Sequence, residues 1–364
     1  MLLAAVLRTH SQVSDLIFSP GRLPQVIIHG QLITMEGAGL HPLTADDTRR
    51  IAADLIGNNK QAINLLREQG FCDVSYSLPG CGRLRVNTFI QRGSCAVVMR
   101  VIPTSIPDFT SLGLPPHLAE VAELSDGLVL VTGPPGSGKS STLAALVNHI
   151  NQVRTCHIIT IEDPIEFLHN HQRATVHQRE LHSDTPSLAL GLRAALRQSP
   201  DVIMVGDLHD RETIDLALEA AETGHLVFSA LNTPDAAQTV ERLVNAFAVV
   251  EQPGVRGRLA KNLRAVVSQR LIPSSASGRV PVIEILKVHP RTVAYLDVPG
   301  LSRHDLVQVM KDGAAQGMQH FDGEMEKLVR GGVVDLETAL GYASDREGLQ
   351  KALESSESRT KSSM

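Results

Sequence analysis

Eight consecutive residues, GPPGSGKS at positions 133–140, are of the types that bind phosphate. They fit the pattern GxxxxGK[ST], in which glycines let the backbone turn so that its N–H groups point inward at an anion. In this pattern Lys139 supplies a positive charge for the β- and γ-phosphates, and the Ser140 hydroxyl is a ligand for Mg²⁺. The pattern therefore predicts a nucleotide-binding site at this loop. Its expected members are Gly133, Pro134, Pro135, Gly136, Ser137, Gly138, Lys139, Ser140 and Ser141.

Two flanking segments would hold this loop in place. Residues 127–131 form a short apolar run rich in β-branched side chains, as in a buried parallel strand. After Lys139, apolar residues recur at the spacing of one helix face, from Leu143 to Ile150. A helix that starts inside the motif directs its free amides and positive dipole end at the phosphate.

Further chemistry is expected where later strands end, since ligands of open α/β sheets bind at the carboxyl ends of the strands. The run HIITIEDPIEF places Glu162, Asp163 and Glu166 just after a strand, where a carboxylate could orient a water or act as a general base. A solvated acidic turn would explain that run as well. DVIMVGDL ends at Asp207, which suits Mg²⁺, and TGHLVFSALNT ends at Asn232, which could bind a γ-phosphate or simply form a turn.

The chain is long enough for two domains. Residues 1–102 are predicted to form a mixed α/β module with an opening helix and extended runs at 25–33 and 83–92. Thr44 and Asp47 form a capping box, which predicts the start of a helix between these two runs. Four prolines mark a linker at 103–117. From residue 118 to 350, apolar runs alternate with amphipathic stretches, which predicts a parallel sheet covered on both faces. The Ser-rich, charged residues 351–364 are expected to be disordered.

Composition argues against several classes of protein. The net charge is −5 and the pI is about 6.3, so no basic field favours nucleic acid as a main partner. The four cysteines form no CxxC pair and suit a reducing cytoplasm. The sequence contains no apolar stretch long enough to predict a membrane span. Membrane contact is therefore expected only through a partner. Fifteen histidines, several of them close together at 169–182, show no zinc-site pattern.

Five segments, in order, resemble the boxes of the PilT-type twitching-motility ATPases, which belong to the type II/IV secretion ATPase superfamily. The segments are GLVLVTGPPGSGKS, HIITIEDPIEF, HQRELHSDT, LRAALRQSPDVIMVGDLHDRETI and AAETGHLVFSALNT. The likeness extends from about residue 11 to 335, because VSDLIFSPGRLPQVIIHGQL resembles the family's N-terminal domain and GMQHFDGEMEKLVRGG its C-terminal helices.

The resemblance implies a PAS-like N-terminal domain and a RecA-like P-loop domain with C-terminal helices. It further implies a cytoplasmic homohexamer at the inner membrane face, which hydrolyses ATP with Mg²⁺ and drives pilus retraction through an inner-membrane platform protein. By the same likeness, Lys139 and Ser140 contact phosphate and metal, Glu166 is the catalytic glutamate, Asp207 takes the Walker B position, and Asn232 takes a histidine position. The remaining site residues that it implies are His225, Arg197, and the interface arginines Arg83 and Arg85.

Three departures from the family pattern fall at working positions. Asp207 is one methylene shorter than the usual glutamate, Asn232 lacks a titratable ring, and His209 replaces an arginine. A carboxylate displaced by about 1 Å can cost about 100-fold in rate, so attenuated turnover is expected. The sequence leaves open a working retraction motor, a low-turnover paralogue that modulates a partner motor, and a related secretion or DNA-uptake ATPase.

Overall fold

The computed structural model describes residues 3, 7, 13–37, 39–78, 82–102, 105–297 and 303–361. The predicted opening helix lies largely outside these residues. The chain forms two compact units, of which the first comprises residues 1–106, 163–168 and 180–186 and the second comprises the rest. The first break between them, after Ile106, falls within the stretch 103–117.

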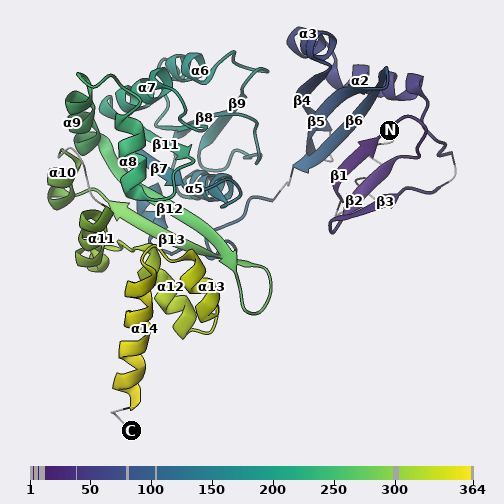
Figure 1. Ribbon diagram of the computed structural model, residues 1–364. Helices are drawn as coiled ribbons and strands as arrows, with labels where there is room; N and C mark the ends of the chain where they lie inside the picture. The colour runs from purple at the N-terminus through teal and green to yellow at the C-terminus, as the bar shows by residue number, and fades with distance from the viewer. Residues whose placement is uncertain are drawn as a thin grey trace. The chain divides into compact units, whose positions relative to one another are not determined.

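Between residues 13 and 102, the described part of the first unit contains a six-stranded antiparallel sheet and the helices α2 and α3 (Figure 1). The strand order is β3-β2-β1-β6-β5-β4. Side chains of β1, β5 and β6, among them Leu16, Leu84 and Met99, are fully buried in one core with residues of α2. The elements are β1 (Val13–Phe18), β2 (Gln25–Ile28), β3 (Gln31–Thr34), α2 (Ala45–Ile56), α3 (Lys60–Gln69), β4 (Phe71–Leu78), β5 (Gly82–Gln91) and β6 (Ser94–Ile102).

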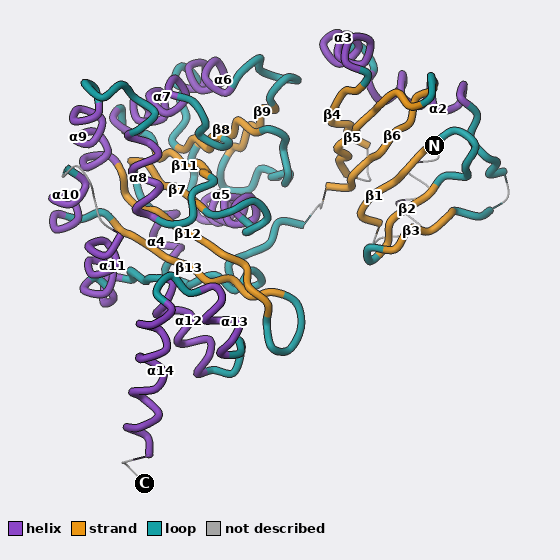
Figure 2. The backbone as a smooth tube through the Cα atoms, in the orientation of Figure 1, coloured by secondary structure: helices purple, strands orange, loops and turns teal. Residues whose placement is uncertain are grey.

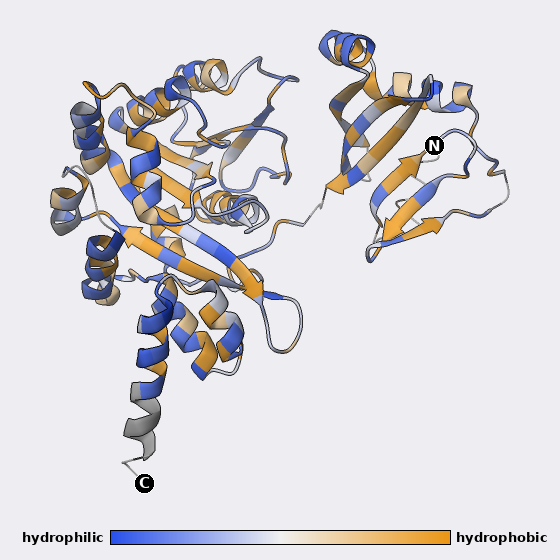
Figure 3. Ribbon diagram, viewed as in Figure 1, coloured by the Kyte–Doolittle hydropathy of each residue, from blue (hydrophilic) through white to orange (hydrophobic). Residues whose placement is uncertain are grey.

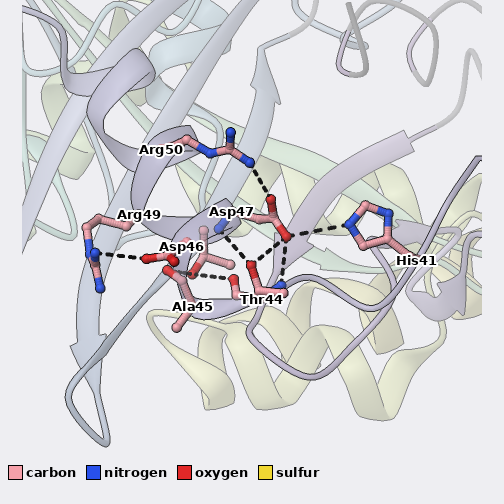
Figure 4. Close-up of polar contacts among 8 residues, drawn as sticks. His41, Thr44, Ala45, Asp46, Asp47, Arg49 and Arg50 are labelled. Carbon is pink, nitrogen blue, oxygen red and sulfur yellow. Dashed lines mark hydrogen bonds and ion pairs between the residues drawn. The ribbon is translucent and has the colours of Figure 1, made fainter.

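The capping box predicted at the start of α2 is confirmed (Figure 4). The Asp47 amide donates to the Thr44 hydroxyl at 3.1 Å, and the Thr44 amide donates to the Asp47 carboxylate at 2.9 Å. Arg50 donates to the same carboxylate at 2.7 Å. The hydrogen bonds from Thr44, assisted by Arg50, hold the pKa of Asp47 well below its usual range.

We expect Thr44→Ala to lower the free energy of unfolding by about 1 kcal/mol, because the Asp47 amide loses its acceptor. Urea unfolding followed by circular dichroism measures the change. Thr44→Ser keeps the hydroxyl and should stay within about 0.5 kcal/mol of the unmodified protein. Equal stability of the alanine and serine variants would contradict the role of the cap.

The second unit is built on a seven-stranded sheet of order β13-β12-β7-β11-β10-β8-β9 (Figure 2). Strands β12, β7, β11, β10 and β8 pair in parallel, and β13 pairs antiparallel to β12. The mainly parallel sheet expected from the sequence is therefore confirmed. The strands are β7 (Gly127–Thr132), β8 (His157–Glu162), β9 (Thr175–Glu180), β10 (Val202–Val205), β11 (Leu226–Leu231), β12 (Leu263–Pro273) and β13 (Arg279–Lys287).

Helices cover both faces of this sheet, so every residue of β7 is buried. Leu128 and Leu130 belong to the core formed with α6, α7, α8 and α9, whereas Val129 and Val131 belong to the core formed with α4 and α5. This is the alternation of side chains that a strand requires. The helices are α4 (Leu118–Ala122), α5 (Lys139–Val153), α6 (Leu188–Ala195), α7 (Arg211–Glu222), α8 (Ala236–Val244) and α9 (Gln252–Asn262).

A smaller helical module, residues 321–361, packs on the β12–β13 hairpin, and we call it the C-terminal module. Phe321 and Met325 of this module share a core with Ile272 of β12 and Val282 of β13. In Figure 3 both the hairpin and the helices beside it mix hydrophobic and hydrophilic residues. Arg270 of β12 stacks on Phe321, with its guanidinium carbon 3.9 Å from the ring centre. The helices after β13 are α10 (Pro290–Leu296), α11 (Arg303–Asp312), η1 (Ala314–Gln316), α12 (Phe321–Arg330), α13 (Leu336–Tyr342) and α14 (Arg346–Lys361).

The expectation of a disordered tail from residue 351 differs from the structure, in which α14 continues to Lys361. Leu349 is buried in the C-terminal core and Leu353, one turn later, packs partly against it. These two apolar contacts lie on one helix face, and their spacing of four residues is the signal that the composition of the tail obscured.

Candidate nucleotide site

The predicted phosphate loop forms the turn between β7 and α5, and its glycines take backbone angles that other residues rarely adopt. The φ angles of Gly133, Gly136 and Gly138 are 148°, 76° and 92°. Gly138 is the N-cap of α5, which begins at Lys139. The loop thus leads directly into the N-terminus of a 15-residue helix, the arrangement that binds phosphate.

A polar chain joins the loop to two other strand ends. The Lys139 ammonium donates to the carbonyl oxygens of Gly133 and Pro134 at 3.0 and 3.3 Å, and to the Asn232 side-chain oxygen at 2.7 Å. The Asn232 amide in turn donates to the Asp207 carboxylate at 2.9 Å. His209 lies 3.6 Å from the same carboxylate. The structure therefore brings Lys139, Asn232 and Asp207 together, although they are far apart in the sequence.

The parallel register of the sheet explains this convergence. The Gly133 amide donates to the carbonyl of Leu231, the last residue of β11, and the Leu208 amide donates to the carbonyl of Ala230. The carboxyl ends of β7, β11 and β10 consequently meet at one edge, which we call the loop edge. Asp207 and Asn232 follow their strands at this edge.

Glu162 also lies at the loop edge, as the last residue of β8. The Gly206 amide donates to the carbonyl of Ile161, which places the end of β8 beside the segment leading to Asp207. The Glu162 carboxylate is 9% exposed and accepts from the Thr160 hydroxyl at 2.6 Å and the Gln178 amide at 3.0 Å. Glu166 lies four residues beyond β8, in the segment 163–168 that groups with the first unit, and it is exposed.

Two of the expected nucleotide-binding residues lie away from the loop edge. His225 precedes β11 whereas Asn232 follows it, so the strand separates them by about 20 Å. The His225 ring contacts the carbonyl of Ala220 at 3.0 Å. Arg197 is exposed between α6 and β10, on the side where β10 begins. The fold brings neither His225 nor Arg197 to the phosphate loop of the same chain.

Arg83 and Arg85 lie two residues apart on β5 and therefore project from one face of the first unit's sheet. Arg83 is paired at 2.8 Å with Glu180, the last residue of β9, which groups with the first unit, and Arg85 is exposed. Their role in a nucleotide site stays a prediction.

The donor set at the loop edge suits Mg²⁺. Ser140 offers a hydroxyl at the start of α5 and Asp207 offers a carboxylate, both hard oxygen ligands of the kind that hold Mg²⁺ together with waters and phosphates. Within the part of the chain that the structure describes, no group of three or more His, Cys, Asp or Glu residues is placed to hold a metal. His169, one of the clustered histidines, is buried, and burial lowers its pKa to about 4.

Sequence reasoning missed the polar residues of β12 behind the loop. Ser268 accepts a hydrogen bond from the Thr132 hydroxyl at 2.9 Å, and Gln269 contacts the loop itself. A signal was present, since two polar residues interrupt the apolar run of β12 and both are fully buried. Buried polar side chains need partners, and here these partners belong to the phosphate-binding segment.

A buried acidic group lies on β13, directly opposite Ser268 of β12. Glu284 of β13 is 1% exposed and accepts from the Ala236 amide, at the start of α8, at 3.0 Å. Asp235, the N-cap of α8, lies 3.6 Å from Arg303. Burial, together with the Asp235 charge, raises the pKa of Glu284 from 4.5 to about 7, against the opposing effect of the Ala236 hydrogen bond and of Arg303 and Arg270.

We expect the stability of the protein to fall as pH rises from about 4.5 to about 7 because of Glu284. In that window the folded state keeps a proton that the unfolded state has released, so the loss is complete above the folded pKa. Relative to the unmodified protein, Glu284→Gln should gain on the order of 1–3 kcal/mol between pH 5 and pH 8, measured by urea unfolding at both values. A difference between the two proteins that does not change with pH would contradict this assignment.

No helix among the described residues combines the length and the apolar character needed to cross a bilayer.

Comparison with known sequences places the chain among pilus and secretion ATPases. The family model for type II/IV secretion system proteins matches residues 76–311. The twitching motility protein of Neisseria gonorrhoeae is 40% identical over 90% of this chain and 86% of its own length. The type IV pilus retraction ATPase PilT of Pseudomonas aeruginosa is 40% identical over 90% and 93%. The type IV pilus ATPase PilU of the same organism is 37% identical over 93% and 87%.

A solved structure extends this likeness to the fold. The crystal structure of the pilus retraction motor PilT with bound ADP superposes with a TM-score of 0.85 at 38% identity, covering 96% of this chain and 99% of that one. Together with the phosphate loop and the polar chain at the loop edge, these matches confirm the resemblance read from the sequence. The chain belongs to the type II/IV secretion system protein family and is a P-loop ATPase.

Proposed function

We propose that this chain hydrolyses ATP with Mg²⁺ in a homohexameric ring and thereby drives type IV pilus retraction. The observation that carries the proposal is the hydrogen-bonded chain from Lys139 through Asn232 to Asp207 beside the phosphate loop. The high similarity to a retraction motor crystallised with ADP supports the choice of nucleotide and of process.

In the proposed reaction, a water oxygen bonds to the γ-phosphorus while the bond from that phosphorus to the bridging oxygen breaks. ADP leaves with the electron pair of this bond, and a carboxylate accepts the proton of the water. Lys139 and the loop amides offset the charge on the phosphates, and Asn232 orients both Lys139 and Asp207. Ser140 and Asp207 would hold Mg²⁺, which supplies positive charge against the phosphate oxygens when bound.

Two carboxylates are candidates for the general base. The family likeness favours Glu166. Glu162 is the alternative, because it ends β8 at the loop edge and its carboxylate is fixed by two hydrogen bonds. Separate Glu162→Gln and Glu166→Gln variants distinguish them, since only loss of the base should lower kcat by about 100-fold or more.

In the proposed ring, Arg83 and Arg85 supply positive charge to the site of a neighbouring subunit. An arginine supplied in this way can raise the rate by about 10³ to 10⁵, so an isolated subunit would be nearly inactive. Arg197 and His225 have no contact with the nucleotide of their own subunit in this proposal. The ring would act at the cytoplasmic face of the inner membrane, on a platform protein of the pilus.

A second candidate function is that of a low-turnover ring that binds ATP and modulates a paralogous pilus motor. Asp207 and Asn232 favour it, because a shorter carboxylate and a non-titratable amide stand at two working positions. The motor remains the preferred function, since Lys139 and Ser140 are in place and Asp207 is held in a defined hydrogen bond.

Phosphate release by the purified chain, measured with Mg²⁺ over a concentration series, separates the two candidates. The oligomeric state is followed in the same samples by light scattering. A motor predicts a rate per subunit that rises as rings assemble. Rings that bind ATP without releasing phosphate would select the modulator, and a rate independent of assembly would exclude catalysis at subunit interfaces.

A further inference from the structure

Gln269 lies in the middle of β12, directly beside the strand that leads into the phosphate loop. Its neighbour Ser268 is paired in register with Thr132, the last residue of β7. The Gln269 side chain is 2% exposed although it is polar. An unpaired amide in such a place would be costly, so its hydrogen bonds are informative.

Both ends of the Gln269 amide bind the phosphate-binding segment. The side-chain nitrogen donates to the carbonyl of Ser137 at 2.6 Å, and the side-chain oxygen accepts from the Thr142 hydroxyl at 2.9 Å. Ser137 belongs to the loop and Thr142 to the first turn of α5. One side chain therefore connects the loop to the helix whose N-terminus it precedes.

Gln269 also fits closely against the glycines at the two ends of the loop. A Cβ atom added at Gly133 would lie 2.3 Å from the Gln269 carbonyl oxygen, and one added at Gly138 would lie 3.1 Å from its side-chain nitrogen. The loop is thus packed against this residue at Gly133 and at Gly138.

We propose that Gln269 is a positioning residue for nucleotide binding, which fixes the orientation of the Ser137–Gly138 peptide. The carbonyl and the N–H of a trans peptide point in opposite directions. With the Ser137 carbonyl bound to Gln269, the Gly138 N–H is directed away from β12 and is available to a phosphate. This inference rests on the proposed nucleotide function of the loop.

Gln269→Glu isolates the donor, because it keeps the size and the acceptor for Thr142. At pH 8 the ionised carboxylate of the Gln269→Glu variant cannot donate to the Ser137 carbonyl. The carboxylate oxygen and the carbonyl oxygen then repel each other. At pH 6 a buried carboxyl, whose pKa is raised by burial, regains a proton and can donate again. Gln269→Met removes both hydrogen bonds at every pH.

The test measures binding of a fluorescent ADP analogue with Mg²⁺ at both pH values, relative to the unmodified chain. Gln319 provides the matched control, since its amide donates to the carbonyl of Ile283 at 2.7 Å and not to the loop. We expect Gln269→Glu to bind about 10-fold more weakly at pH 8 and to recover to within about threefold at pH 6. Gln269→Met should remain weak at both, and Gln319→Glu and Gln319→Met should bind normally.

Normal binding by Gln269→Met, a defect in Gln269→Glu that is the same at both pH values, or equal defects in the Gln319 variants would overturn the inference. If Gln269→Glu does not fold at pH 8, ADP binding by Gln269→Met still tests whether the hydrogen bonds of Gln269 are needed. Failure of the unmodified chain to bind ADP would instead refute the proposed function itself. The two failures are therefore distinguishable.

Discussion

Lys139→Ala should lower kcat/KM for ATP hydrolysis by at least about 100-fold. The Lys139 ammonium is held by Gly133, Pro134 and Asn232, so it is fixed at the loop edge before any phosphate arrives. Alanine removes the charge that offsets the phosphates and leaves the Asn232 oxygen without this donor. Mg²⁺-dependent phosphate release over an ATP series measures the loss.

Lys351→Ala is the matched control, because Lys351 is an exposed lysine of α14 outside the site. The Lys351→Ala variant should keep kcat/KM within about twofold of the value of the unmodified protein. An alanine variant of Lys139 that keeps more than about a third of the activity would mean that the loop edge is not where ATP is hydrolysed.

Gly133→Ala should abolish nucleotide binding and lower the free energy of unfolding by about 2–5 kcal/mol. At φ 148° a side chain is strained, and the added Cβ would lie 2.3 Å from the Gln269 backbone oxygen and 2.6 Å from the Ser137 hydroxyl. Backbone cannot move aside as a flexible side chain can, so either β12 or the loop must shift.

Gly278→Ala is a control that has the backbone strain of a positive φ angle without the steric clash expected at Gly133. Gly278 has φ 74°, and an added Cβ would meet no atom within 4 Å. Its substitution should cost only about 1 kcal/mol and should leave nucleotide binding intact. Urea unfolding and ADP binding measure both effects. If the two glycine variants lost equal stability, the collision at Gly133 would not matter.

The sequence was sufficient for the features of the fold and of the site that depend on local pattern. The phosphate loop, the strand that precedes it and the helix that follows were predicted from adjacent residues, as was the capping box of Thr44 and Asp47. Glycines, a cap and an apolar run each impose a conformation on neighbours a few residues away, so a single segment carries the information.

What could not be predicted depends on residues that are distant in the chain. The contact of Gln269 with Ser137 spans 132 residues, and that of Asn232 with Asp207 spans 25. Such pairs follow from strand order and register, which periodicity alone does not specify. The assignment of His225 came from the family likeness, although the apolar run between His225 and Asn232 already indicated that a strand separates them.

Consecutive residues of β12 face opposite ways, and this joins two distant parts of the second unit. Gln269 supports the phosphate loop, while Arg270 donates to the Tyr342 carbonyl at 2.8 Å and stacks on Phe321 of the C-terminal module. A shift of β12 at Gln269 would also shift Arg270 and its contacts with Phe321 of α12 and Tyr342 of α13. The phosphate loop and the helices α12 and α13 are therefore held by neighbouring residues of one strand.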